Sequence, residues 1–96
     1  MPAYVTALVT VSNQQEILTY AKQVDATVAQ YGGRFIVKGG PVAAVLEGDL
    51  RPHTVTILEF PTLERAHAWY GSPAYRDIIH HRHEAGSSQV ILSQHS

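Results

Sequence analysis

Short blocks of glycine and proline divide this chain into segments whose apolar residues repeat at strand and helix spacings. The main blocks are Gly32-Gly33, Gly39-Gly40-Pro41 and Ser72-Pro73. Glycine accepts the backbone angles at which elements end, and proline suits the first turn of a helix because its missing N–H is not needed there. The positions of the blocks therefore set the order of elements that the chain can form.

Four segments have the composition of strands. They are residues 3–11, 33–38, 54–60 and 89–93, and residues 42–46 form either a further strand or an arm. The first segment is apolar on both faces and carries no charge, which is typical of a strand buried on both sides.

Two helical regions lie between these strands. The first is predicted from the N-cap Asn13 to Tyr31, because apolar residues recur there at steps of three and four. The second is predicted from Thr62 to about Tyr70, and it restarts at Ser72 and runs to Gly86.

The resulting order, β-α-β-β-α-β, predicts an α+β ferredoxin-like domain with an antiparallel sheet over residues 1–96. Two helices cover one face of the sheet, and no element is left for the other face. Because the strands are apolar on both sides, we expect a homodimer whose sheets face each other and close an α/β barrel.

Charge and cysteine content exclude several classes of function. The chain has 7 basic and 8 acidic residues without a long run of either sign, so no nucleic-acid-binding surface is expected. It has no cysteine, which excludes disulfides and thiolate chemistry and is consistent with a cytoplasmic location. No signal peptide, membrane span or cofactor-binding motif is present, so no membrane partner and no cofactor are expected.

Several of the blocks occur in an order and spacing that resemble a known family. They are Tyr31-Gly32-Gly33, Lys38-Gly39-Gly40, Leu46-Glu47-Gly48, Glu59-Phe60-Pro61, and Trp69-Tyr70 followed by Ser72-Pro73 and Tyr75. The chain resembles the domain-of-unknown-function family 1330 of the dimeric α/β-barrel superfamily, from about Tyr4 to Leu92. The resemblance implies the fold and a dimer, and no reaction. Superfamily relatives include cofactor-independent monooxygenases, isomerase-like enzymes and stress-related binding proteins.

Arg82 is the residue with the strongest case for a functional role. It shares a helical face with Tyr75, Ile78 and Ile79, so it is expected to point inward and to need a carboxylate partner such as Glu59. The two residues form either a structural ion pair or a site in which Arg82 anchors an anion and Glu59 acts as a base. His53, at the start of a strand, is a further acid–base candidate.

Aromatic residues supply the candidate walls of a ligand pocket. Phe35, Trp69, Tyr70 and Tyr75 lie near element ends and either pack the core or contact a small molecule. Lys38 is also a candidate ligand-binding residue. It is expected to pair with Glu47 across the Gly39-Gly40-Pro41 turn.

No metal site is expected. His80, His83 and Glu84 have helical spacings that two ligands could share, but no complete ligand set is present. The leading interpretation is a dimer that binds a small aromatic or carboxylated molecule between sheet and helices, as a cofactor-independent monooxygenase-like or isomerase-like enzyme. The alternatives are a non-catalytic binding or stress-response module and a dimerisation domain with a filled interior.

Overall fold

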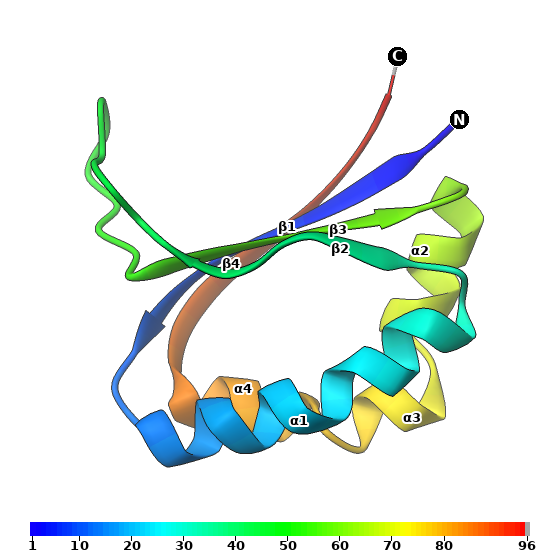
Figure 1. The fold of residues 1–96 in the computed structure, drawn as a ribbon, viewed down its shortest axis with the longest axis horizontal. Helices are drawn as coiled ribbons and strands as arrows, with labels where there is room; N and C mark the ends of the chain where they lie inside the picture. Colours follow the sequence, from blue (N-terminus) through cyan, green and yellow to red (C-terminus); the bar gives the residue numbers. More distant parts are fainter. Residues whose placement is uncertain (96) are drawn as a thin grey trace.

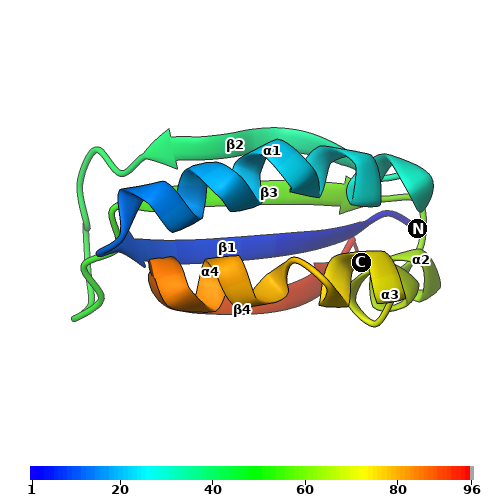
Figure 2. The same cartoon turned by 90° about the horizontal axis from the view of Figure 1, so that it is seen from below.

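A four-stranded antiparallel sheet with helices on one face makes up the molecule (Figure 1). The structure is a computed structural model that describes residues 1–95. The strand order is β2-β3-β1-β4. The elements, in chain order, are β1 (Ala3–Val11), α1 (Gln14–Gln30), β2 (Arg34–Pro41), β3 (Thr54–Phe60), α2 (Leu63–Tyr70), α3 (Pro73–Arg76), α4 (Ile79–Ala85) and β4 (Gly86–Gln94). Seen from below, the helices lie in front of the strands (Figure 2). The predicted ferredoxin-like fold is confirmed.

Side-chain caps fix where the helices begin. The Asn13 side chain accepts from the Glu16 N–H at 3.2 Å, and Thr62 Oγ1 accepts from the Arg65 N–H at 3.1 Å. Ser72 Oγ accepts from the Tyr75 N–H at 3.2 Å, with Pro73 at the first helical position. Each cap satisfies an N–H group that the first helical turn leaves without a partner.

The second helical region differs from the prediction in its last part. A single helix was expected from Ser72 to Gly86, but α3 ends at Arg76 and α4 begins at Ile79. Strand β4 also begins at Gly86, three residues earlier than expected. A Cβ atom at Gly86 would lie 1.9 Å from the Thr10 carbonyl oxygen, so only glycine lets the chain pass directly from α4 into pairing with β1.

Residues 42–53 form an arm, not a further strand. The base of the arm is held by a bond from the Val42 N–H to the His53 carbonyl at 3.0 Å. The arm rises on the side of the sheet away from the helices (Figure 1), and Leu46 within it is 92% exposed.

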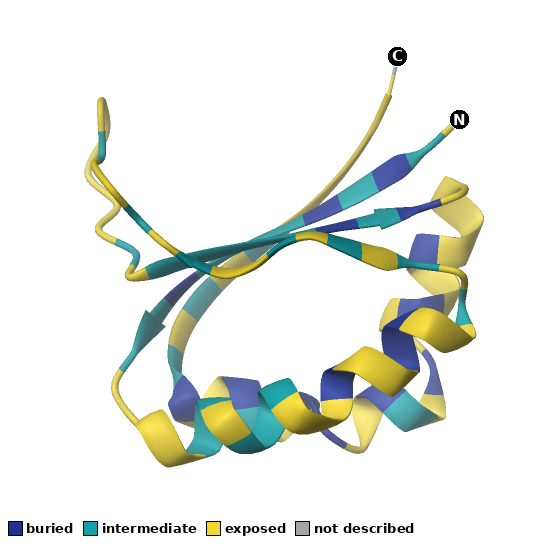
Figure 3. Cartoon of the chain, viewed as in Figure 1, coloured by how far each residue is buried: buried dark blue, intermediate teal, exposed yellow. Residues whose placement is uncertain are grey.

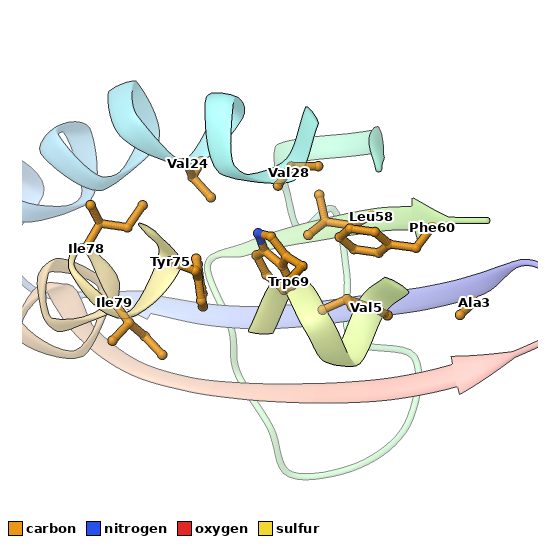
Figure 4. Packing of buried hydrophobic residues seen from close by; sticks show 11 residues of the cluster. Ala3, Val5, Val24, Val28, Leu58, Phe60, Trp69, Tyr75, Ile78 and Ile79 are labelled. Atoms are coloured by element: carbon orange, nitrogen blue, oxygen red, sulfur yellow. The ribbon is translucent and has the colours of Figure 1, made fainter. Parts of the chain in front are cut away.

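The core lies between the helices and the inward face of the sheet (Figure 3). Trp69, Tyr75 and Phe60 are its largest fully buried side chains, and Figure 4 shows Trp69 between β3 and α1. The Trp69 Nε1–H donates to Thr27 Oγ1 at 3.1 Å, which satisfies the one polar atom that the indole buries.

The opposite face of the sheet carries apolar side chains that no helix covers. On β1, Val5, Ala7 and Val9 face the helices, so the alternate residues Thr6 and Leu8 face outward. Ile91 on β4 pairs with the outward Thr6 and is 61% exposed, and Ile36 on β2 is 46% exposed. Within residues 1–95, none of the helices has the length and hydrophobicity needed to cross a bilayer.

Candidate functional site

A cavity of about 110 Å³ lies between the inward face of the sheet and the helices. Its wall is mostly apolar and includes the aromatic rings of Tyr20, Phe35, Trp69 and Tyr75. The Trp69 and Tyr75 ring centroids are 4.2 Å apart, and Tyr20 meets Tyr75 edge-on at 6.2 Å. The aromatic walls give the cavity surfaces on which a flat molecule packs well.

Arg82 of α4 supplies a buried positive charge to this cavity. Its side chain is 4% exposed, and its Nη1 donates to Ser88 Oγ on β4. Its Nε–H is buried and has no hydrogen-bond partner among the described residues. Burial favours a lower pKa for Arg82, but the hydroxyl groups of Tyr75 and Tyr20 outweigh this effect and raise the pKa, so the guanidinium stays charged.

Two tyrosine hydroxyls lie beside the arginine. Tyr20 Oη and Tyr75 Oη are hydrogen-bonded at 2.8 Å. Burial, and after it the neighbouring Tyr75, raises the pKa of Tyr20 well above its ordinary value despite the opposing charge of Arg82. Tyr20 is therefore a neutral phenol at physiological pH and acts as a hydrogen-bond donor or acceptor, not as a base.

Lys38 lines the cavity on its β2 side. Its Nζ forms an ion pair with Asp25 of α1 and lies 4.9 Å from the centroid of the Phe35 ring. The expected pairing of Lys38 with Glu47 is wrong. Helix α1 passes beside β2, and its Asp25 pairs with Lys38 instead. The Lys38 side chain is 40% exposed, so this part of the wall faces solvent.

Glu59 does not meet Arg82, and the predicted ion pair between them is wrong. Glu59 Oε1 accepts from Arg34 Nε at 2.7 Å, because Arg34 and Glu59 are paired across β2 and β3. This hydrogen bond holds the pKa of Glu59 below its ordinary value, although partial burial opposes it. Leu58 and Phe60 point to the helices, so Glu59 between them points to the other face of the sheet.

His53 and Tyr70 also lie outside the set of side chains that line the cavity. His53 is exposed, and its Nδ1 accepts from the Val11 N–H at 3.1 Å, which ties the end of the arm to β1. The Arg76 guanidinium carbon lies 4.7 Å from the centroid of the Tyr70 ring. The Tyr70 ring also packs on Tyr75, with 5.8 Å between the ring centroids. Of the residues predicted as site residues, the cavity brings together Phe35, Lys38, Trp69, Tyr75 and Arg82.

The prediction missed Tyr20 and the inward threonines Thr54 and Thr56. Tyr20 lies three residues after Ile17 and four before Val24, so its spacing already placed it on the apolar face of α1. The threonines alternate with Val55 and Ile57 along β3, but the sequence does not show which set faces the helices.

Comparison with known proteins identifies the family. The sequence profile of the domain of unknown function DUF1330 matches residues 2–95. The chain belongs to the DUF1330 family. No curated protein sequence matches it.

Solved structures share the fold of this DUF1330 chain. A protein of unknown function from Rhodopseudomonas palustris is 21% identical, with a TM-score of 0.76 over 99% of this chain and 82% of that one. A dimeric ferredoxin-like protein of unknown function from Jannaschia sp. CCS1 is 11% identical, with a TM-score of 0.80 over 99% and 100%. SnoaB from Streptomyces nogalater, a cofactor-independent oxygenase, is 13% identical, with a TM-score of 0.64 over 99% and 92%. At these identities the likeness concerns the fold.

Proposed function

We propose that this DUF1330 protein binds a small aromatic molecule with one acidic oxygen-bearing group in the cavity, and that Arg82 holds that group. The observation that carries the proposal is the buried Arg82 Nε–H, which has no partner among the described residues. A buried charged donor without an acceptor is costly unless a ligand or water supplies one.

The chemistry of the cavity wall selects the charge of the ligand. Arg82 and Lys38 are cations, the lining contains no carboxylate, and the two tyrosines share one hydrogen bond. That bond uses one hydroxyl proton, so the second hydroxyl proton is available to an acceptor beside Arg82. The wall thus combines a guanidinium with a neighbouring phenol O–H donor, which suits a carboxylate or another oxyanion.

The size of the cavity limits the ligand to about one ring. Its volume of about 110 Å³ is of the same order as an apolar cavity of about 150 Å³ that admits benzene. A ring would pack against Trp69 and Tyr75, and its acidic group would reach Arg82.

Turnover of the bound molecule is a second candidate function. It is favoured by the fold shared with SnoaB, a cofactor-independent oxygenase, and by a fixed cation in an apolar cavity, which stabilises developing negative charge. Neither Glu59 nor His53 lines the cavity, so in such an enzyme Arg82 would act by electrostatic stabilisation. Oxygen uptake in the presence of a molecule that binds separates an oxygenase from a binding or stress-response module.

We further propose that the protein is a homodimer formed through the uncovered face of the sheet. Support comes from the exposed Ile36 and Ile91 on that face and from similar folds that are dimeric. Sedimentation equilibrium of wild-type protein and of Ile91→Asp tests this. We expect a dimer that the substitution dissociates, and a wild-type monomer at all concentrations would contradict it.

The ligand proposal is tested by a thermal-shift screen of small aromatic acids, with Arg82→Met and Arg76→Met as variants. Arg76 is an exposed arginine on the neighbouring α3, so Arg76→Met controls for the loss of one positive charge. We expect acids such as benzoate or phenylacetate to stabilise the wild type and Arg76→Met, and not Arg82→Met. Equal stabilisation of all three proteins, or of none, would contradict the proposal.

A further inference from the structure

A second group of polar side chains lies apart from the cavity wall, where the start of α1 packs against the end of α4. The N–H groups of Ser12 and Asn13 donate to the Ala85 carbonyl at 2.7 and 2.9 Å and hold the two helix ends together. Glu16 lies in the first turn of α1, and His81 and Glu84 lie three residues apart on α4. One ligand atom from each of these three residues lies within 4.8 Å of the others.

The group carries two carboxylates and makes one ion pair, which joins His81 to Glu16. His81 Nδ1 and Glu16 Oε2 are 2.6 Å apart, and this is the only ion pair that the three residues make within residues 1–95. The Glu84 carboxylate has no hydrogen-bond or ion-pair partner in the same range. Two carboxylates beside one imidazole therefore lack a Lys or Arg counter-charge, and a bound cation would remove their mutual repulsion.

We propose that Glu16, His81 and Glu84 bind a divalent transition-metal ion of the Zn²⁺ or Mn²⁺ kind. An imidazole nitrogen favours such ions over Mg²⁺ and Ca²⁺, which prefer oxygen ligands alone, and carboxylates complete the set. Three protein ligands leave positions for water, in keeping with the exposure of Glu84.

The side chains must rotate to close around an ion. Two oxygen or nitrogen ligands of a tetrahedral zinc ion lie roughly 3.4 Å apart, as follows from metal–ligand bonds of about 2.1 Å. The present separations of up to 4.8 Å exceed this by about 1.4 Å. Rotation of Glu84, which is exposed and unpaired, brings its carboxylate closer without moving a helix.

This site is independent of the proposed ligand cavity, because none of its three residues lines that cavity. It would join α1 and α4, the helices that carry Tyr20 and Arg82. An ion that binds only the folded chain stabilises it, so metal binding should appear as a rise in Tm.

Isothermal titration calorimetry of the untagged, metal-free protein with Zn²⁺ and with Mn²⁺ tests the proposal. The decisive variant is Glu84→Gln. It removes one carboxylate ligand and leaves the hydrogen bond between Glu16 and His81 intact. His83→Asn and Glu64→Gln are matched controls, since they remove an exposed histidine on the same helix and an exposed glutamate on α2.

We expect at least one of the two ions to bind with one ion per chain. Glu84→Gln should weaken that binding by ~10-fold or more, since losing even an outer-sphere partner typically costs that much. Both controls should bind as the wild type does. Absence of wild-type binding of both ions at millimolar concentration, unchanged affinity in Glu84→Gln, or an equal loss in His83→Asn would overturn the proposal.

Discussion

The hydroxyl oxygens of Tyr20 and Tyr75 lie 2.8 Å apart although the residues are 55 positions apart in the sequence. This contact links α1 to α3 beside Arg82, and it determines which hydrogen-bond donors the cavity presents. Because one hydroxyl donates to the other, the second hydroxyl keeps its proton for another acceptor. The contact therefore contributes both to the stability of the fold and to the selectivity of the cavity.

The first prediction concerns this contact. Tyr75→Phe should lower the free energy of unfolding by about 1 kcal/mol, because a hydroxyl of a part-buried hydrogen bond is lost while the ring packing remains. Urea denaturation measures the change. Tyr31→Phe is the control, because the Tyr31 hydroxyl has no hydrogen-bond partner within residues 1–95, and it should change the stability little. An equal effect of the two substitutions would show that the hydrogen bond contributes nothing.

The second prediction separates a structural role of Arg82 from a binding role. Arg82 has no carboxylate partner, so Arg82→Met should leave the stability of the ligand-free protein unchanged or raise it. Thermal unfolding without ligand measures this. A fall in Tm of many degrees would contradict this expectation, because it would mean that the fold depends on the guanidinium.

The third prediction concerns the pH dependence at Glu59. The pKa of its carboxyl is below the ordinary value chiefly because Arg34 donates to it, so the Arg34–Glu59 pair favours the folded state above the pKa of the unfolded chain. The contribution is lost as the pH falls through the lowered, folded-state pKa. NMR titration of the Glu59 side chain should give a midpoint below that of Glu59 in Arg34→Gln. Identical midpoints would contradict the pairing.

The fourth prediction concerns the junction between α4 and β4. Gly86→Ala should destabilise the protein by about 2 kcal/mol or more, because the added Cβ would overlap the Thr10 carbonyl oxygen at 1.9 Å. Gly71→Ala is the control, since its Cβ would make an ordinary contact of 3.6 Å. Chemical denaturation compares the two variants. Similar stabilities would show that the chain turns differently at Gly86.

Local signals in the sequence were sufficient for the order of elements. Asn13, Thr62 and Ser72 are caps whose side chains bond within three residues, so their effect can be read without the tertiary fold. The inward direction of Arg82 followed from its helical spacing to Tyr75 and Ile79. The break between α3 and α4 was missed because no glycine or proline marks it in the sequence.

The partners of charged residues were much harder to predict. Glu59 was assigned to Arg82, but the alternation of Leu58, Glu59 and Phe60 along β3 places the carboxylate on the opposite face. Its pairing with Arg34 depends on the register of two strands, which the sequence does not display. The same holds for Glu16 and His81, which are 65 positions apart and meet only through the packing of α1 on α4.

The central claim is that the cavity holds an acidic oxygen at Arg82. Isothermal titration calorimetry of benzoate and of its neutral analogue benzamide, with wild-type protein and Arg82→Met, tests this claim most directly. We predict that the wild type binds benzoate ~10-fold or more tightly than benzamide, as expected for a charge-assisted hydrogen bond, and that Arg82→Met removes the difference. Equal binding of the two compounds by the wild type, or a preference for benzoate that persists in Arg82→Met, would contradict it.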